Sequence, residues 1–231
     1  MRLQRLGFLG PQGTFSHEAA SQLEGNYEFI PLDSIPDVLN ALRDGSVDRA
    51  IVPIENVIED VVGQTVDWLI ADEGSVKIVG ELLLPIRQTI LGQPGMNLEK
   101  VTEVISHPQP LGQCSKIINA YGWEKVEAHS TARAAKIVAE AGAGASMVAI
   151  GSPFLAELYG LEILQKEAAD HNHNVTRFLV LGGEKLPPTG DDRTTIFLST
   201  KDIPGAIHLV TGVFFYNGIN LTKTAQGRLY Q

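Results

Sequence analysis

Short apolar runs alternate with amphipathic stretches along this chain, and this alternation constrains the fold more than any other feature. The first run, residues 6–9, has the continuous apolarity of a buried strand, and a helical pattern follows at 15–23. Further strand-like runs lie at 27–31, 49–53, 76–84, 102–105, 126–128, 147–150 and 176–181, and further helical patterns at 35–43, 64–71, 111–121, 131–140 and 153–159. We therefore predict an α/β fold with largely parallel sheets.

The pattern changes after residue 184. Residues 185–192 are charged, rich in proline and glycine and without periodicity, which is typical of a linker. Beyond them the sequence predicts one strand–helix–strand unit, with strands at 194–198 and 219–223 and a helix at 204–216. Elements of this size bury little apolar surface by themselves. We expect the unit to pack on the main domain or on another chain, or to be incomplete.

Composition excludes several classes of function. The chain has 27 acidic and 18 basic residues, and its formal net charge of -9 repels phosphates, so we expect no nucleic-acid partner. The single cysteine, Cys114, excludes an internal disulfide or a multi-cysteine metal site and is typical of a core residue. No signal peptide or membrane-spanning run is apparent, because charges and proline interrupt the most apolar stretch, residues 77–91. We expect a cytoplasmic protein without a membrane partner.

Polar side chains gather at junctions between predicted strands and helices, where α/β folds place ligand-binding groups. The candidates at these junctions are Thr14, Glu55, Asn56, Ser106, Gln109, Ser130 and Thr131. At each junction an ordinary role, a turn or a helix cap, stands beside the ligand-binding one. The glycine-rich residues 10–16 are either a tight turn or an anion site at a helix start. Together the junctions indicate a cleft for a small carboxylate-bearing molecule.

Two more candidates, Thr176 and Arg177, open the last long apolar run. A buried arginine needs an anion or a carboxylate as its partner. The preceding His171 and His173 form a His-x-His pair without an apparent third ligand, so we expect a polar crossover loop and no metal. These residues alone do not separate an enzyme from a solute-binding protein.

Taken in order, these segments resemble the prephenate dehydratase family. The matching runs are Gly10-Pro11-Gln12-Gly13-Thr14-Phe15-Ser16, Val52-Pro53-Ile54-Glu55-Asn56, Ser106-His107-Pro108-Gln109, Ser130-Thr131-Ala132 and Asn174-Val175-Thr176-Arg177-Phe178. Residues 205–207 and 218–223 resemble the first half of the ACT regulatory domain of that family. The resemblance covers essentially the whole chain.

The resemblance implies a two-lobed catalytic domain like a type II periplasmic binding protein, with the active site between the lobes. This domain would span residues 1–184, with lobe one at 1–76 and 166–184 and lobe two at 77–165. Residues 185–192 would be a linker, and 193–231 a truncated ferredoxin-like ACT unit. Two chain crossings would form a hinge between the lobes.

The family reaction converts prephenate to phenylpyruvate with loss of water and carbon dioxide, in phenylalanine biosynthesis. Aromatisation drives it, so the resemblance implies no cofactor. The essential threonine of the family matches Thr176, which would donate a hydrogen bond to the departing hydroxyl. Asn56 and Gln109 would orient the substrate, and Glu55 would be a relay or a structural carboxylate.

The resemblance also implies groups that hold the two carboxylates of the substrate. Thr14, Ser106, Ser130 and Thr131 would donate hydrogen bonds to them, and Arg177 would pair with one or hold the hinge strand. A related prephenate decarboxylase that does not aromatise, and a non-enzymatic protein that binds an aromatic precursor, remain alternatives.

Departures from the family pattern concern both domains. Val57, Asp60 and Pro110 stand where the family usually has Ser, Gly and Ala. The run at 224–227, Thr-Ala-Gln-Gly, replaces the residues that usually contact phenylalanine. We therefore expect phenylalanine to bind weakly or not at all, and the exposed apolar face of the unit, including Val213, to pair two chains in a dimer or a higher homo-oligomer.

Overall fold

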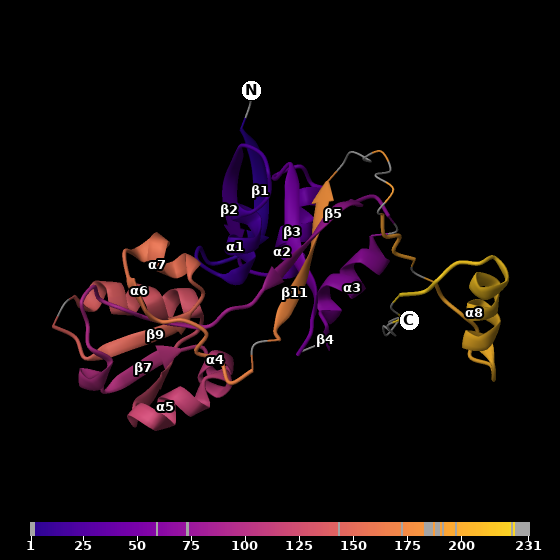
Figure 1. The fold of residues 1–231 in the computed structure, drawn as a ribbon. Coiled ribbons are helices and arrows are strands. Elements are labelled where there is room, and N and C mark those ends of the chain that lie inside the picture. Colours follow the sequence, from indigo (N-terminus) through magenta and orange to yellow (C-terminus); the bar gives the residue numbers. More distant parts are fainter. Residues whose placement is uncertain are drawn as a thin grey trace.

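Two mixed sheets, each covered by helices, form two lobes that the chain crosses between twice (Figure 1). The structure is a computed structural model that describes residues 3–58, 60–72, 74–142, 144–171, 173–182, 187, 190, 192–196, 198–222 and 224. Among these residues, no helix combines the length and the apolarity needed to cross a membrane. The two sheets and their two lobes confirm the two-lobed α/β architecture implied by the resemblance.

The first lobe is built on a sheet with the strand order β2-β1-β3-β11-β5, to which the short β4 adds by pairing with β3. Its strands are β1 (Gln4–Leu9), β2 (Tyr27–Leu32), β3 (Arg49–Asn56), β4 (Asp60–Val61), β5 (Lys77–Pro85) and β11 (Val175–Gly182). Its helices are α1 (Phe15–Ser21), α2 (Ile35–Arg43) and α3 (Gly63–Ala71). Strands β2, β1 and β3 are parallel, and β11 runs antiparallel to both β3 and β5.

The second lobe is built on a sheet with the order β10-β6-β9-β7-β8. Its strands are β6 (Thr89–Gly92), β7 (Glu103–Ser106), β8 (Glu124–Glu127), β9 (Met147–Gly151) and β10 (Glu162–Gln165). Its helices are the 3₁₀ turn η1 (Leu98–Lys100), α4 (Pro108–Gln113), α5 (Ser115–Tyr121), α6 (Thr131–Ala141) and α7 (Phe154–Tyr159). Strands β7, β8 and β9 are parallel, whereas β6 and β10 join antiparallel.

The sheets are mixed rather than largely parallel, and the reason lies in the crossings. Strand β5 leaves the first lobe and β11 returns to it at the same edge, so the two run in opposite directions as neighbours. We expected lobe two to begin at residue 77 and the return to begin at 166, and both boundaries are wrong. Strand β5 lies in the first sheet, and Ala168 packs in the core of the second lobe.

Local patterns placed most elements but not all of them. The helix expected at 111–121 is two helices, α4 and α5, which meet at Cys114. Strands β6 and β10 were not predicted. Cys114 is fully buried in the second lobe, where burial and the nearby Asp170 raise the pKa of its thiol to about 12. The thiol therefore stays protonated, as expected of a core residue.

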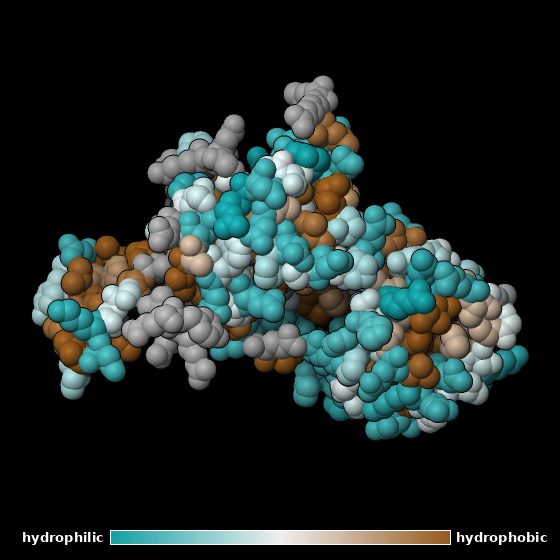
Figure 2. Space-filling model, turned by 180° about the vertical axis from the view of Figure 1, so that it is seen from behind, coloured by the Kyte–Doolittle hydropathy of each residue, from teal (hydrophilic) through white to brown (hydrophobic). Residues whose placement is uncertain are grey.

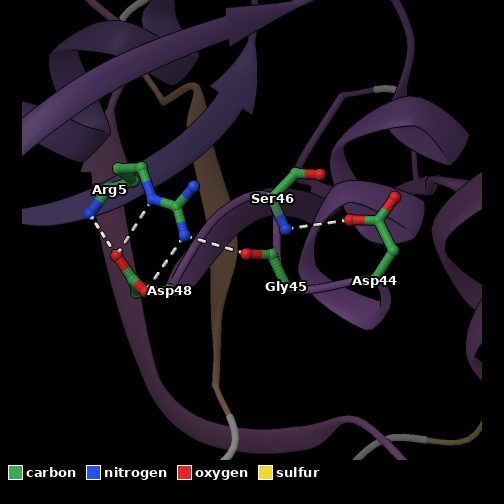
Figure 3. Close-up of polar contacts among 5 residues, drawn as sticks. All are labelled: Arg5, Asp44, Gly45, Ser46 and Asp48. Carbon is green, nitrogen blue, oxygen red and sulfur yellow. Dashed lines mark hydrogen bonds and ion pairs between the residues drawn. The ribbon is translucent and has the colours of Figure 1, made fainter.

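The turn that enters β3 is tied to β1 by Arg5 and Asp48 (Figure 3). The Arg5 amide donates to Asp48 Oδ2 at 2.7 Å, and the Asp48 amide donates back to the Arg5 carbonyl at 2.9 Å. The guanidinium adds a bond of 2.8 Å to the Gly45 carbonyl. These contacts set the start of β3, and so the position at which β3 ends beside the crossings.

The C-terminal segment differs from the predicted strand–helix–strand unit. Helix α8 (Ala206–Tyr216) forms, and Figure 1 shows it apart from both lobes. The described residues of the predicted strands at 194–198 and 219–223 form no strand. A strand needs a partner to take its backbone hydrogen bonds, and no neighbouring strand pairs with these residues. The predicted linker at 185–192 lies mostly outside the described residues.

Candidate active site

The strand ends that carry the candidate residues point to the crossings between the lobes. In the first sheet, Asn56 at the end of β3 lies opposite Thr176 near the start of β11, and Val175 lies opposite Pro85 at the end of β5. In the second sheet, Thr89 follows the first crossing and lies opposite Gly151 at the end of β9. Figure 2 shows the surface hollowed between the two lobes. The fold thus turns the candidate-bearing edges of both sheets toward one cleft.

A hydrogen-bonded cluster of Asn56, Asn174 and Thr176 lies at the first-lobe side of this cleft. Asn56 Nδ2 donates to Asn174 Oδ1 and to Thr176 Oγ1, both at 2.7 Å. Asn56 Oδ1 accepts from the Ile58 amide at 2.8 Å, which fixes the orientation of the side-chain amide. Asn174 and Thr176 are 7% and 9% exposed, so these bonds are shielded from water. The cluster holds the threonine hydroxyl in one place.

The direction of these bonds decides where the proton of the Thr176 hydroxyl points. Its oxygen accepts from Asn56 Nδ2, so its own hydrogen is left to donate elsewhere. Among the described residues no acceptor takes that hydrogen. Thr176 therefore presents a hydrogen-bond donor at the edge of the cleft.

Arg177 lies on the opposite face of β11 and is held by two carboxylates of the chain itself. Its guanidinium pairs with Glu81 at 2.7 Å and with Glu55 at 3.4 Å. Successive side chains of a strand point to opposite faces. The pair Glu55–Arg177 therefore lies on the face of the sheet opposite the pair Asn56–Thr176. The structure does not bring Glu55 or Arg177 together with the Thr176 hydroxyl. It supports the hinge-strand role weighed for Arg177.

In the second lobe the candidate hydroxyls have local partners. Ser106 is fully buried and donates to the Ile150 carbonyl at 2.7 Å, so it joins β7 to β9 and does not cap α4. Ser130 caps α6, because its Oγ accepts from the Arg133 amide at 3.0 Å. Thr131 is the first residue of α6 and is 8% exposed. The amides of the first turn of this eleven-residue helix have no partner within the helix.

Gln109 lies in the first turn of α4 and is exposed. The N-cap of this helix is His107, whose Nδ1 lies 3.4 Å from the Gln109 amide. The exposed histidines His171 and His173 lie at the second crossing. Among the described residues, no three histidine, cysteine or acidic side chains come together in a way that could hold a metal ion.

The turn between β1 and α1 belongs to the first lobe and packs against the second lobe. Thr14 caps α1, donating to the Leu9 carbonyl at 2.9 Å and accepting from the amide at position 17 at 3.3 Å. Gly13 has a φ of +88°, and a Cβ there would lie 2.7 Å from Leu155 Cδ2 and 3.1 Å from Ala132 Cβ. The first and fourth of the matching runs therefore meet directly.

This contact predicts that Gly13→Ala is costly for two reasons. The left-handed backbone alone costs about 1–2 kcal/mol with a Cβ, and the crowding against Leu155 adds about 1–3 kcal/mol. The matched control is Gly45→Ala, because Gly45 has a φ of +78° and nothing within 4 Å of the added Cβ. Thermal melts should show a larger loss for Gly13→Ala. Equal losses would mean that the lobes separate freely at this contact.

Two departures from the family pattern have a structural account. Val57 is 69% exposed, so its side chain is not part of a core. Asp60 has a φ of +66°, a conformation that glycine adopts without cost and that aspartate tolerates better than most residues. The usual glycine at this position is thus explained by the backbone of the turn into β4.

Sequence reasoning missed Asn174 as a member of this site and Glu81 as the partner of Arg177 on the opposite face of β11. Asn174 was part of the matching run, but its bond to Asn56 joins residues 118 positions apart. Glu81 interrupts an apolar strand, which is the available signal, and its partner Arg177 lies 96 positions away. A charge in an apolar strand predicts that a partner exists but not which residue it is.

Comparison with known proteins gives consistent results. The sequence profile of the family "PDT: Prephenate dehydratase" matches residues 6–186. A bifunctional chorismate mutase/prephenate dehydratase of Aquifex aeolicus is 39% identical over 225 residues, covering 95% of this chain. The chain spans only 60% of the length of that relative.

A shorter relative and a solved structure carry the same family name. A prephenate dehydratase of Methanocaldococcus jannaschii is 36% identical, with 92% of this chain and 78% of that protein covered. The crystal structure of a prephenate dehydratase from Arthrobacter aurescens in complex with L-Phe is 30% identical, with a TM-score of 0.79. That likeness covers 95% of this chain and 74% of the other.

Proposed function

This chain belongs to the prephenate dehydratase family, and we propose that it converts prephenate to phenylpyruvate with loss of water and carbon dioxide, a step of phenylalanine biosynthesis. The observation that carries the proposal is the cluster of Asn56, Asn174 and Thr176. It leaves an oriented hydroxyl donor in a cleft, which the loss of a ring hydroxyl requires.

The proposed reaction needs little beyond positioned hydrogen bonds. The bond from the ring to its carboxylate carbon breaks, and its electron pair enters the ring while the hydroxide leaves the opposite carbon. The carboxylate leaves as carbon dioxide. Thr176 donates a hydrogen bond to the departing oxygen and so stabilises the charge that develops on it, and the hydroxide takes a proton from solvent to become water. An alcohol is too weak an acid to lose its proton freely, so Thr176 acts as an oriented donor or a relay.

The second lobe supplies the proposed anion site for the substrate. The amides of Thr131 and Ala132, which have no partner within α6, and the Ser130 and Thr131 hydroxyls beside them favour a carboxylate. Gln109 lies at a further junction and is proposed to add a neutral donor. We do not assign a substrate contact to the Thr14 side chain, because its hydroxyl already donates to the Leu9 carbonyl. We do not assign a substrate contact to Ser106, because its hydroxyl is buried and bonded to Ile150.

One assay separates this proposal from the alternatives. The chain is incubated with prephenate, and phenylpyruvate is followed by its absorbance after subtraction of the uncatalysed rate. Release of carbon dioxide without phenylpyruvate would indicate a decarboxylase that does not aromatise. Binding of prephenate with neither product would indicate a binding protein and would overturn the proposal.

We also propose that residues 193–231 begin an ACT regulatory domain and that α8 pairs with a second copy of the chain. The support is the apolar surface that α8 exposes (Figure 2). Ile207, Leu209 and Phe215 are 70%, 64% and 77% exposed, and no residue of the helix is buried. Such a surface is typical of an interface. Weak binding of phenylalanine to this chain stays a prediction.

Light scattering after size-exclusion chromatography tests the pairing. We expect a dimer or larger assembly of the 231-residue chain, and we expect Phe215→Glu to shift it toward the monomer, because the carboxylate would be desolvated in the interface. The control is Leu3→Glu, which adds the same charge at another exposed apolar position, 41% exposed, in the first lobe. A monomeric chain, or equal effects of both variants, would contradict the pairing.

A further inference from the structure

A second cluster, centred on His17 of α1, lies where the first lobe contacts the second. The imidazole stacks on the Phe8 ring of β1, with centroids 4.8 Å apart and an interplanar angle of 12°. The rings of Phe29 from β2 and Phe154 from α7 meet it edge-on, at 5.4 Å and 5.1 Å. Phe154 belongs to the second lobe, so His17 is a point of contact between the lobes.

The same imidazole also holds the turn before α1. The Gly13 amide donates to His17 Nδ1 at 3.0 Å in a buried setting. An Nδ1 that accepts must be unprotonated, so the histidine is neutral with its proton on Nε2. Burial also favours the neutral imidazole, because desolvation lowers the pKa of His17 below its ordinary value of 6.5.

Gly13 is itself packed against the second lobe. An added Cβ would touch Leu155, Ala132 and Leu158, and Ala132 lies in the first turn of α6 beside Ser130 and Thr131. His17 therefore touches both sides of the contact. Its ring meets α7, and its Nδ1 accepts from the amide of Gly13, the residue that packs against the start of α6.

We propose that His17 is a positioning residue for substrate binding, which holds the Gly13 turn and the second lobe in the arrangement that forms the carboxylate site at the start of α6. This inference rests on the proposed dehydratase function. Two properties of the side chain carry it separately. The ring supports the contact by packing, and the acceptor at Nδ1 sets the turn.

Two variants separate these properties. His17→Phe keeps an aromatic ring among Phe8, Phe29 and Phe154 but removes the acceptor, so the Gly13 amide loses its buried partner. His17→Asn keeps an acceptor, because Asn Oδ1 and His Nδ1 are both bonded to Cγ, but it removes the ring. We expect His17→Phe to raise KM for prephenate about tenfold with a small change in melting temperature. We expect His17→Asn to melt lower but to restore much of the KM.

A purely structural role predicts the opposite relation between the two measurements. KM would then follow the melting temperature, with the less stable His17→Asn variant binding prephenate worse than His17→Phe. That result would overturn the proposal. A wild-type KM in a folded His17→Phe variant would overturn it as well.

The pH dependence adds a readout that packing alone does not move. As pH falls through the lowered pKa of His17, its Nδ1 gains a proton and can no longer accept from Gly13, so KM should rise. The rings around the imidazole carry no charge. Glu18 is the titratable residue next to His17 in the sequence, and burial raises its pKa against the opposing effects of the Ser152 hydroxyl and Arg87.

The His17→Asn variant retains Glu18 and Arg87, so the difference between the two pH profiles isolates His17. The acid rise of KM should be smaller in the variant than in the wild type. Identical profiles would overturn the proposal.

Amide hydrogen exchange at Gly13 distinguishes failure of this inference from failure of the proposed function. Followed by nuclear magnetic resonance without substrate, the amide should exchange slowly in the wild type and in His17→Asn, and faster in His17→Phe. If the wild type does not turn over prephenate but this pattern holds, the proposed function fails and the positioning of the turn stands. Equal exchange in all three proteins would overturn the role of His17.

Discussion

Thr176→Ala should lower kcat about 100- to 1000-fold and leave KM for prephenate nearly unchanged. The hydroxyl is the donor that Asn56 orients toward the cleft, and its bond to the departing oxygen strengthens as the ring carbon–oxygen bond breaks. Loss of one such preorganised donor costs about 2.7–4 kcal/mol of transition-state stabilisation. Steady-state kinetics with prephenate measure both parameters.

Thr176→Ser is the matched control, because it keeps the hydroxyl and removes only a methyl group. It should retain most of the turnover and give Asn56 Nδ2 an oxygen to bond. Both variants should fold, since Thr176 lies at the start of β11 and its backbone pairing with Asn56 and Leu84 does not depend on the side chain. A kcat near the wild-type value in Thr176→Ala would remove this residue from the mechanism.

Asn56→Asp should be as damaging as Thr176→Ala, with a fall of about 1000-fold in kcat/KM, equivalent to about 4 kcal/mol. The substituted carboxylate can no longer donate to Asn174 Oδ1 or to Thr176 Oγ1. It would instead accept a hydrogen bond from the Thr176 hydroxyl and so withdraw that donor from the substrate. Its negative charge would also repel a substrate that carries two carboxylates.

Asn56→Ala is the comparison for this variant, because it removes the same bonds without adding charge. The Asn56→Ala variant should lose less affinity for prephenate than the Asn56→Asp variant. If both variants bind prephenate equally well, the side chain at position 56 does not face the substrate carboxylates. Combining Asn56→Ala with Thr176→Ala should add little to the loss from Thr176→Ala alone, since Asn56 acts on catalysis largely by orienting that hydroxyl.

Much of the local structure could be predicted from the sequence, because it depends on residues close together in the chain. Helix α2 has the predicted bounds, Ile35–Arg43, since its apolar spacing and the Ser34 cap are local signals. The same holds for the Thr14 and Ser130 caps. The resemblance placed Asn56 and Thr176 in one site, and the register of β3 and β11 brings them opposite each other.

Side-chain partners could not be predicted, because they depend on pairings between distant segments. Ser106 has the sequence context of a helix cap or a substrate donor, yet the neighbouring β9 supplies the Ile150 carbonyl that accepts its hydrogen bond. Arg177 has the context of an anion-binding arginine, yet β5 supplies Glu81. In both, a strand that pairs alongside satisfies a group which the sequence leaves open.

The sequence by itself thus determined most strands and helices of the two lobes, the Thr14, Ser34 and Ser130 caps and the set of polar residues at the junctions. Only the tertiary structure decided which sheet takes β5, where the lobes divide, and which hydroxyl keeps a proton to donate. Periodicity and capping act over a few residues and can be read along the chain. The Thr176 donor depends on a bond to Asn56 across 120 positions, and a bond of that kind exists only after the sheets have paired.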